Sequence, residues 1–587
     1  MLDAVSMHGG GRDPTIPDSP FPHDWIFFHA ERTPQAPAVA SPFARLSYSV
    51  LAERVRRIGG RLAAAGIGVG DRVLVALPST PASVALSLAV TCLGGVSVEV
   101  NRDWDAALLR AIVRKSAVRA AAIWGPDAEK WVTVFAGAPL QMICFVRAGP
   151  APDGAPPTFG GHTVLIHQDG HLDDGGAALA ACVGEMRPDQ DALCLYTSGS
   201  TGKPHGVVQT FRNIDANSRS IVQYLRLTAD DRALLTLPLY YCYGRSVLQT
   251  HLLVGGSVYL DQRFAFPRVV LEEAVSEGCT GFAGVPMTFE ILRRQVNVES
   301  MTFPRLRYVT QAGGAMSIET ARWVRRAFYP AQLFVMYGQT EATARLSYLP
   351  PELAEDKEGS IGIPIPGVEL TVVDERGREV PPGVTGELVA RGDNVTRGYL
   401  DDPEGTAAIL RDGWLWTGDL AYRDADGFYF LVGRSKEILK IGGHRVSPTV
   451  IEQVVARHPD VAEVAVIGVG HELQGEAPAA FVVPRSGRSP SEADLQHYCR
   501  GRLPAYEVPV RFILVDALPR NDSGKLLRAE LAGRYPSTGS SACRPTRAVG
   551  ERGALQEETR ELASRDDIRS PDEAARAPGP RRRGHED

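Results

Sequence analysis

Stretches with the pattern of buried strands alternate with stretches of helical spacing over most of this chain. Residues 71–77 and 96–100 are apolar runs of strand length, and residues 82–93 between them have helical spacing. The same alternation resumes between residues 232 and 337. Strands that alternate with helices favour parallel sheets whose two faces are covered by helices. The sequence therefore predicts an α/β fold built on parallel sheets.

The length of 587 residues is too great for one hydrophobic core, so we expect several modules. Short strands and turns between residues 359 and 432 predict a small β region, and the residues from Lys436 onward predict a compact α+β unit. Both ends of the chain are poor in large apolar residues. The expected division is a disordered leader at 1–22, a large N-terminal domain at 23–435, a small C-terminal domain at 436–533 and a disordered tail at 534–587.

Charge and cysteine content narrow the class of protein. A net charge of −6 argues against a surface that binds nucleic acid. The eight cysteines are scattered without a CxxC pair, so we expect neither a zinc site nor a disulfide framework. Reduced thiols fit a cytoplasmic protein, and no apolar run of the sequence reaches the length of a membrane span. We therefore expect a cytoplasmic protein with no nucleic-acid partner and no membrane span.

One glycine-rich stretch follows an apolar strand and predicts an anion site. Residues 196–207 read Tyr-Thr-Ser-Gly-Ser-Thr-Gly-Lys-Pro-His-Gly-Val. Glycines let backbone N–H groups converge on one centre, and the hydroxyls and Lys203 add donors. The spacing from Gly199 to Gly202 is too short for a Walker loop. The alternatives are a polyphosphate loop and an ordinary Gly/Ser turn, and the lysine with the ordered hydroxyls favours the first.

Other predicted strands also end in polar or glycine-rich turns. The strand pattern that starts at Arg307 leads into Gly313 and Gly314, and the pattern that starts at Leu333 leads into Thr340 and Glu341. In open α/β sheets, ligands bind beyond the carboxyl ends of the strands. We therefore expect these turns and the glycine-rich stretch to line one crevice.

Six short motifs occur one after another along the chain, and together they indicate a family. The chain resembles the adenylate-forming superfamily over residues 25 to 530; this superfamily comprises acyl-CoA synthetases, adenylation domains of peptide synthetases and luciferases. The motifs that carry the resemblance are residues 196–207, 337–341 (Tyr-Gly-Gln-Thr-Glu), 417–420 (Thr-Gly-Asp-Leu), 433–434 (Gly-Arg), 440–448 and 519–525.

The resemblance implies a reaction in two halves. A carboxylate attacks the α-phosphate of ATP, which gives an acyl-adenylate and pyrophosphate. A thiol, from CoA or from the phosphopantetheine arm of a carrier protein, then attacks the adenylate. The implied fold is a large N-terminal domain of several subdomains, with parallel α/β sheets and a small β region, followed by a small mobile α+β domain. The sequence is therefore interpreted as an AMP-forming acid–CoA ligase that uses ATP, Mg²⁺ and CoA.

The resemblance also assigns roles to residues. Lys525 would reach the attacking carboxylate and the α-phosphate, and Thr340 would donate to the α-phosphate. Glu341 and Thr201 would hold Mg²⁺. The residues expected to bind the nucleotide or the pantetheine arm are Thr197, Ser198, Gly199, Ser200, Thr201, Gly202, Lys203, Gly313, Gly314, Tyr337, Gly338, Asp419, Arg434, Gly442 and Gly443. Within this set, Tyr337 would face the adenine, and Asp419 would accept the ribose hydroxyls beside Arg434.

The resemblance further implies that the small domain rotates about a hinge residue, which is Lys436 in this sequence. Rotation would exchange Lys525 for Gly442 and Gly443, which would line a thiol tunnel where the backbone passes close to pantetheine. His444 and Arg445 either position the thiol or lie in a solvated loop.

Two stretches depart from the common pattern of the superfamily. His205 stands where a lysine is usual, which predicts a weaker phosphate contact. The expected acid pocket comprises Tyr240, Tyr241, Cys242, Tyr243, Arg245 and Gly284. Because Tyr241, Cys242 and Tyr243 supply no carboxylate for an ammonium group, an α-amino acid substrate is disfavoured. Arg245 either binds a second anionic group of the acid or reaches solvent or a neighbouring carboxylate.

Three other functions remain open from the sequence. A stand-alone adenylation enzyme would load a carrier protein instead of CoA. An enzyme for an unusual acid, even an inorganic one such as nitrite, would pass the adenylate to a nucleophile other than a thiol. A non-catalytic binding module is disfavoured because Lys525, Glu341 and Asp419 are all present.

Overall fold

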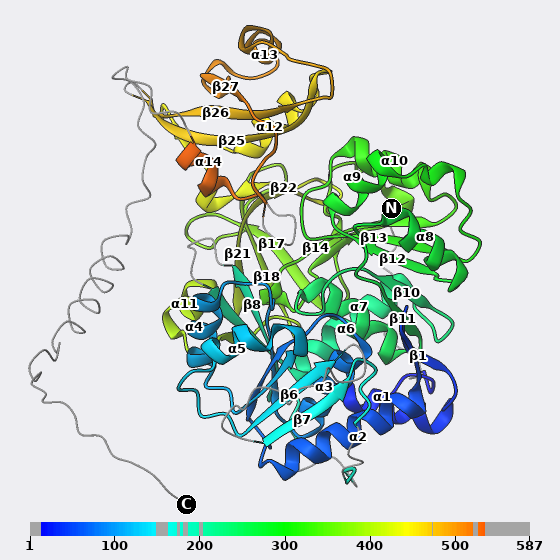
Figure 1. Cartoon of the computed structure of the whole chain (residues 1–587). Coiled ribbons are helices and arrows are strands. Elements are labelled where there is room, and N and C mark those ends of the chain that lie inside the picture. The colour runs from blue at the N-terminus through cyan, green and yellow to red at the C-terminus, as the bar shows by residue number, and fades with distance from the viewer. Residues whose placement is uncertain are drawn as a thin grey trace, which may run out of the picture.

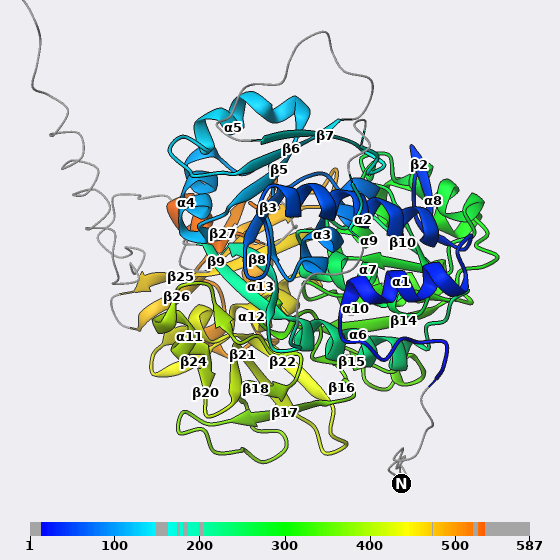
Figure 2. The same cartoon turned by 90° about the horizontal axis from the view of Figure 1, so that it is seen from below.

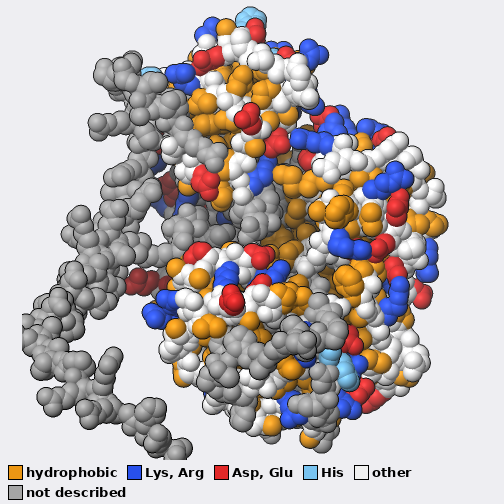
Figure 3. Space-filling model, viewed as in Figure 1, with side chains coloured by type: hydrophobic (Ala, Val, Ile, Leu, Met, Phe, Trp, Pro, Cys, Tyr) orange, Lys and Arg blue, Asp and Glu red, His pale blue; other side chains and the backbone are white. Residues whose placement is uncertain are grey.

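The computed structural model forms a large lobe and a small lobe (Figure 1). It describes residues 13–147, 162–172, 177–179, 186–198, 204–471, 474–520 and 526–534. The space-filling view shows the small lobe above the large one (Figure 3). The chain passes between the lobes through a short 3-10 helix at Ser435–Glu437.

Sheet A provides the strand ends at which the candidate site lies. Its strands are β1 (Pro37–Ser41), β2 (Ala44–Ser47), β10 (Arg232–Leu235), β11 (Ser257–Leu260), β12 (Gly281–Gly284), β13 (Tyr308–Gln311), β14 (Gln332–Tyr337), β15 (Ser347–Leu349) and β16 (Ile363–Pro364). Their order is β16-β15-β14-β13-β12-β10-β11-β1-β2. The neighbours from β14 to β1 pair in parallel, and antiparallel strands close both edges.

Sheet B has the same mixed character. Its strands are β3 (Arg72–Ala76), β4 (Val96–Glu99), β5 (Ala120–Trp124), β6 (Met142–Arg147), β7 (His162–His167), β8 (Asp191–Ser198), β9 (Pro204–Thr210) and β19 (Gly398–Tyr399). Their order is β19-β9-β8-β4-β3-β5-β6-β7. The strands from β8 to β7 are parallel, whereas β9 pairs antiparallel with β8. The glycine-rich stretch is thus the connection of an antiparallel β8–β9 pair.

Helices cover the sheets and also lie between them. The helices of the large lobe are α1 (Pro22–Arg32), α2 (Tyr48–Ala64), α3 (Pro81–Cys92), α4 (Ala106–Ser116), α5 (Ala128–Val134), α6 (Phe211–Leu225), α7 (Cys242–Leu253), α8 (Pro267–Ser276), α9 (Pro286–Gln295), α10 (Ile318–Ala327) and α11 (Pro403–Ile409). Every residue of α3 and α7 is buried, and both helices share one core cluster with side chains of β3 and β10. A helix that is buried all round belongs to the interior of a large domain. Figure 2 shows α1, α2 and α3 beside one another.

Two smaller sheets complete the chain. Sheet C comprises β17 (Val368–Val373), β18 (Gly386–Gly392), β20 (Leu410–Arg411), β21 (Trp414–Arg423) and β22 (Tyr429–Arg434). The small lobe contains sheet D, with β23 (Leu439–Ile441), β24 (His444–Val446), β25 (Val461–His471), β26 (Gly475–Pro484) and β27 (Arg511–Leu514), and the helices α12 (Pro448–Val455), α13 (Glu492–Cys499) and α14 (Arg528–Arg534).

The predicted fold class is confirmed. The parallel sheets, the small β region and the C-terminal α+β unit are all present. The leader expected at 1–22 differs, because residues 13–22 are held against the large lobe. Arg219 donates to the carbonyl of Pro17 at 2.7 Å, and Trp25 donates to that of Ser19 at 2.8 Å. Within the described residues, none of the helices combines the length and apolar character needed to cross a bilayer.

Candidate active site

The ends of β13 and β14 carry two sharp turns that need glycine. Gly313 follows β13 with φ +85°, and a Cβ there would lie 2.3 Å from the hydroxyl oxygen of Tyr241. Gly338 follows β14, and a Cβ there would lie 2.1 Å from the carbonyl oxygen of Ala344. A side chain at Gly338 would push its backbone away from that of Ala344, and one at Gly313 would displace the side chain of Tyr241. The predicted Gly313 and Gly338 thus bring the two strand ends and the start of α7 into close contact.

Tyr337, Asp419 and Arg434 form one hydrogen-bonded group. The Tyr337 hydroxyl donates to Asp419 Oδ2 at 2.6 Å, and Arg434 Nε lies 2.6 Å from Asp419 Oδ1. Burial and the Asp419 charge hold the pKa of Tyr337 well above its usual value, so its hydroxyl stays a donor. Asp419 is buried and fixed by β21, while Arg434 ends the neighbouring β22. The three residues predicted from separate motifs therefore meet.

Glu341 lies beside a second polar group. The Tyr399 hydroxyl donates to Glu341 Oε1 at 2.8 Å. The ring of His205 packs against that of Tyr399 at a tilt of 31° with centroids 4.6 Å apart, and His205 Nδ1 lies 3.1 Å from Asp402 Oδ2. Burial, followed by the Glu341 charge, raises the pKa of Tyr399 far above its usual range. His205 therefore has a carboxylate partner at the start of α11, a contact that was not predicted from the sequence.

The turn after β14 is tightly held. Thr340 is buried, and its hydroxyl donates to Cys242 Sγ at 3.4 Å. Thr343 has φ +63°, a costly conformation for a β-branched residue. Its hydroxyl donates to the carbonyl of Asn394 at 2.7 Å, and Gln209 donates to its carbonyl at 3.2 Å. These contacts fix Thr340 and Glu341 relative to α7 and sheet C.

The predicted acid pocket is largely assembled on α7. Tyr243 donates to Thr310 Oγ1 at 2.8 Å, and burial raises the pKa of Tyr243 to about 12. Cys242 is buried beside Thr340, and burial also raises the pKa of its thiol. Gly284 ends β12 under the ring of Phe289. Tyr240 is half-buried just before the helix, and Gly314 follows Gly313 beside Pro286.

The side chain of Arg245 is not directed into this pocket to bind an anion. It forms a buried ion pair with Glu99 at the end of β4, and it also donates to Ser87 Oγ at 3.1 Å and to the carbonyl of Leu239 at 3.2 Å. The alternative that the sequence left open, a neighbouring carboxylate, is the one found. The physical reason is that α7 lies between the sheets, so Arg245 meets sheet B.

Arg345 lies four residues after Glu341 and was not predicted as a site residue from the sequence. Only 3% of its surface is exposed, and its Cζ lies 4.1 Å from the centroid of the Tyr243 ring. A cavity of about 20 Å³ adjoins it. Its other lining residues are Ile221, Leu225, Ala233, Ser246, Val247, Thr250, His251, Phe282, Ala283, Tyr308, Thr310 and Met336. A charged residue in the apolar run Ala-Thr-Ala-Arg-Leu was the available signal.

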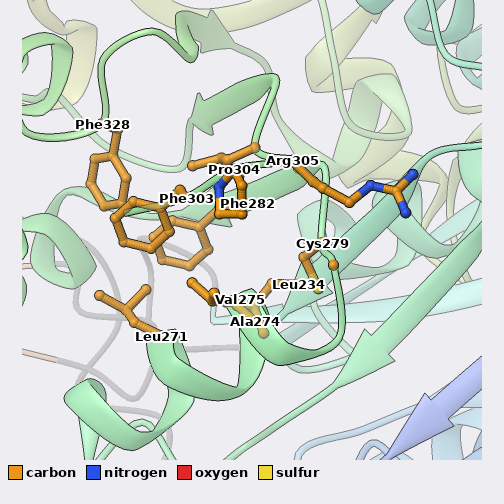
Figure 4. Close-up of a pocket in the computed structure, with 13 residues that line it drawn as sticks. Leu234, Leu271, Ala274, Val275, Cys279, Phe282, Phe303, Pro304, Arg305 and Phe328 are labelled. Carbon is orange, nitrogen blue, oxygen red and sulfur yellow. The ribbon is translucent and has the colours of Figure 1, made fainter. Parts of the chain in front are cut away.

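A second cavity lies away from these residues. It measures about 10 Å³ and opens between α8, β12 and residues 303–306. Figure 4 shows Phe282, Phe303 and Phe328 around it, with the guanidinium of Arg305 pointing away. Since its walls are apolar and hold none of the predicted site residues, we assign it to the core.

Several predicted residues lie outside the described residues. These are Gly199, Ser200, Thr201, Gly202, Lys203 and Lys525, together with the side chains of Ser198 and Arg445. Thr197 is described and lies opposite His205 on the β8–β9 pair.

The thiol-tunnel residues lie in the small lobe. Lys436 is in the 3-10 helix between the lobes, and Gly442 and Gly443 form the β23–β24 turn with φ +55° and +87°. A Cβ at either glycine would meet open space, so their positive φ is what requires glycine. His444 stacks on Tyr506 with centroids 4.1 Å apart.

The residues around Glu341 fit one magnesium ion. Among the described residues, groups of three or more His, Cys, Asp or Glu side chains that could enclose a metal are absent. Mg²⁺ is commonly held by one or two carboxylates together with substrate phosphates, so a protein cage is not required. Tyr399 occupies one oxygen of Glu341, and the other oxygen has no hydrogen-bond donor among the described residues.

Comparisons with known proteins place this geometry in a family. A family model described as AMP-binding enzyme matches residues 26–400, and one described as AMP-binding enzyme C-terminal domain matches residues 450–525. The chain belongs to the AMP-binding enzyme family. The two matches cover both lobes, and the resemblance to the adenylate-forming superfamily is confirmed.

Curated relatives and solved structures agree with this assignment. Sulfoacetate–CoA ligase of Cupriavidus necator is 33% identical over 86% of this chain and 96% of its own length. Oxalate–CoA ligase of Arabidopsis thaliana is 30% identical over 84% of this chain and 93% of its own length. The crystal structure of ATP-bound MatB from Rhodopseudomonas palustris has a TM-score of 0.78 at 27% identity, over 88% of this chain and 99% of MatB.

Proposed function

We propose that the site joins a small acid to CoA in two steps, with an acyl-adenylate between them. The chain is an AMP-forming acid–CoA ligase, and its relatives are named as ligases of this kind. The observation that carries the residue assignments is the meeting of Tyr337, Asp419 and Arg434 beside the turn that holds Thr340 and Glu341. ATP is the nucleotide of the first step.

The nucleoside part of ATP is assigned to the Asp419 group. Each carboxylate oxygen has a second lone pair besides the one that Tyr337 or Arg434 engages, so Asp419 can accept hydroxyl donors from ribose. Tyr337 and Arg434 hold its carboxylate in one orientation, which lowers the entropic cost of binding. The backbone at Gly313 and Gly314 offers a surface that a flat base can approach closely.

The phosphates are assigned to the turn after β14 and to the β8–β9 connection. Thr340 would donate to the α-phosphate, where negative charge grows during attack by the acid. Mg²⁺, when bound by Glu341 and Thr201, would neutralise phosphate charge. Thr197 and residues 198–203 would hold the terminal phosphates, and His205 next to this stretch contacts Asp402.

We assign the small lobe two orientations, one for each step of the reaction. Lys525 would act at the attacking carboxylate in the first step, and Gly442 and Gly443 would line the pantetheine path in the second. Lys436 would be the hinge between domains at 23–435 and 436–533. The narrow connection at Ser435–Glu437 supports this assignment.

CoA is the proposed acceptor, and a carrier protein is the alternative. Relatives named for CoA favour the first. We also propose a cytoplasmic location, because the described cysteines are buried and form no disulfide with one another; they are Cys92, Cys144, Cys194, Cys242, Cys279 and Cys499.

A pyrophosphate-release screen tests the function. Short acyl, aryl, dicarboxylic, sulfonated and inorganic acids are each mixed with ATP, Mg²⁺ and purified protein, with CoA, with a phosphopantetheinylated carrier protein, or with neither. We expect at least one organic acid to release pyrophosphate and to yield a thioester of CoA. If a thioester forms only on the carrier protein, the acceptor is a carrier protein and not CoA. If nitrite releases pyrophosphate and no thioester forms, the proposed acid–thiol ligase function is wrong.

A further inference from the structure

We propose that Arg345 binds a second anionic group on the acid. The substrate class is then a short acid that bears a carboxylate or sulfonate in addition to the carboxylate that reacts with ATP. This inference rests on the proposed ligase function of the same site and names the substrate class that the site selects.

The guanidinium of Arg345 is a buried charge without an anionic partner. Among the described residues, no carboxylate lies within ion-pair distance of it, although only 3% of its surface is exposed. A buried charge is costly unless another charge compensates it. Arg245, on the neighbouring helix, has such compensation from Glu99. The part of the chain that the structure describes therefore offers no anion to Arg345.

The neighbours of Arg345 hold the side chain but leave donors unused. Its Nη1 donates to the carbonyl of Ala344 at 3.2 Å, and its Nε contacts Met336 Sδ at 3.3 Å. The Tyr224 hydroxyl lies near enough to interact with it, and the Tyr243 ring lies under it. An arginine has five N–H donors in a planar fork that matches carboxylate oxygens. The remaining donors suit a bidentate anion.

The backbone of Arg345 is fixed for this task. Its carbonyl accepts hydrogen bonds from Asn394 Nδ2 at 2.8 Å and from Asn217 Nδ2 at 3.3 Å. Both amides come from other elements, one on α6 and one after β18. A binding residue that is held before the ligand arrives loses less entropy on binding.

A small cavity lies beside Arg345 and is lined in part by residues of α7. The cavity of about 20 Å³ holds about one water molecule, so it suits a compact group better than an alkyl chain. Tyr243 lies under Arg345, and the preceding residue, Cys242, contacts Thr340. Cys242 and Tyr243 are consecutive residues at the start of α7, so Thr340 and Arg345 both contact the same turn of this helix. The acid is therefore short.

Matched acid pairs test this assignment. Malonate and succinate are each compared with their monomethyl esters, and 3-sulfopropanoate is compared with 3-(methylsulfonyl)propanoate. The readout is kcat/KM for pyrophosphate release by the full chain. We expect the wild-type protein to prefer the anionic member of a pair by at least about tenfold, since hydrogen bonds to charged groups are the strong ones.

Two substitutions of Arg345 test whether this residue causes the preference for the anionic acid. Arg345→Met keeps the length of the side chain without its charge, and we expect it to lower kcat/KM for the dianionic acid about 100-fold while the ester changes little. Arg345→Lys keeps the charge without the planar fork and should retain an intermediate preference. Arg245→Met is the control: it lowers thermal stability but leaves the ratio within each pair unchanged.

The outcomes separate this inference from the ligase function. Pyrophosphate release with neutral-tailed acids only, or an unchanged ratio in Arg345→Met with wild-type thermal stability, would overturn the role of Arg345 and leave the ligase standing. If no acid releases pyrophosphate, the ligase function fails. Thermal stabilisation of the wild type by malonate or succinate, lost in Arg345→Met, would then still support the anion receptor, and its absence would overturn it.

Discussion

Two buried arginines lie on opposite sides of α7 and have opposite surroundings. Arg245 faces sheet B and is closed by Glu99, Ser87 and Leu239. Arg345 faces the ends of sheet A and has an aromatic ring, a sulfur atom and a carbonyl, but no described carboxylate. A polar group that the chain satisfies itself contributes to stability, whereas one that stays open is available for a ligand. The compensated Arg245 lies in the interior of the large lobe, whereas the open Arg345 lies near the ends of β13 and β14.

The largest expected effect is on stability. Glu99→Ala leaves Arg245 buried without its partner, and we expect the free energy of unfolding to fall by about 3–5 kcal/mol. Denaturant unfolding measures it. The double variant Glu99→Ala/Arg245→Met should recover much of the loss, because an apolar replacement of a buried pair is often neutral. If Glu99→Ala is as stable as the wild type, the ion pair between Glu99 and Arg245 does not form in solution.

A large effect on activity is expected at Asp419. Asp419→Asn removes the charge that Arg434 contacts and weakens the acceptor for the ribose hydroxyls, so kcat/KM for ATP should fall about 100-fold. Stability should change less than in Glu99→Ala, because Arg434 is partly exposed. Asp424→Asn, which alters an ion pair with Lys357, is the matched control. Equal losses in both variants would remove Asp419 from the nucleotide site.

A smaller effect is expected at Glu341. Glu341→Gln removes one negative charge from the proposed magnesium ligands, and the Mg²⁺ concentration for half-maximal pyrophosphate release should rise at least about tenfold. The measurement is a Mg²⁺ titration at saturating ATP and acid. An unchanged titration curve would place the metal elsewhere.

The smallest effect is expected at Tyr399. Tyr399→Phe removes the hydroxyl that orients Glu341, and the Mg²⁺ requirement should rise about two- to fivefold, as for one neutral donor. Tyr422→Phe, whose ring stacks on Phe430, is the matched control. If the two variants titrate alike, the Tyr399 contact does not orient the metal ligand.

Much of this site could be predicted because its chemistry lies in short motifs. Thr340 and Glu341 are neighbours in sequence, and the order of the motifs indicated that Asp419 and Arg434 share a site with them. The structure joins Asp419 and Arg434 across the β21–β22 pair. The contact between His205 and Asp402 could not be predicted, since the two residues come from distant segments without a common pattern.

The sequence by itself determined the class of fold and the family. Alternating strand and helix patterns need only local periodicity, and a motif needs only neighbouring residues. The tertiary structure alone decided between the two arginines. Both stand in apolar surroundings in the sequence, and whether a charge is compensated depends on which side chains pack against it. Glu99, at the end of a strand in sheet B, packs against Arg245, and no described carboxylate packs against Arg345.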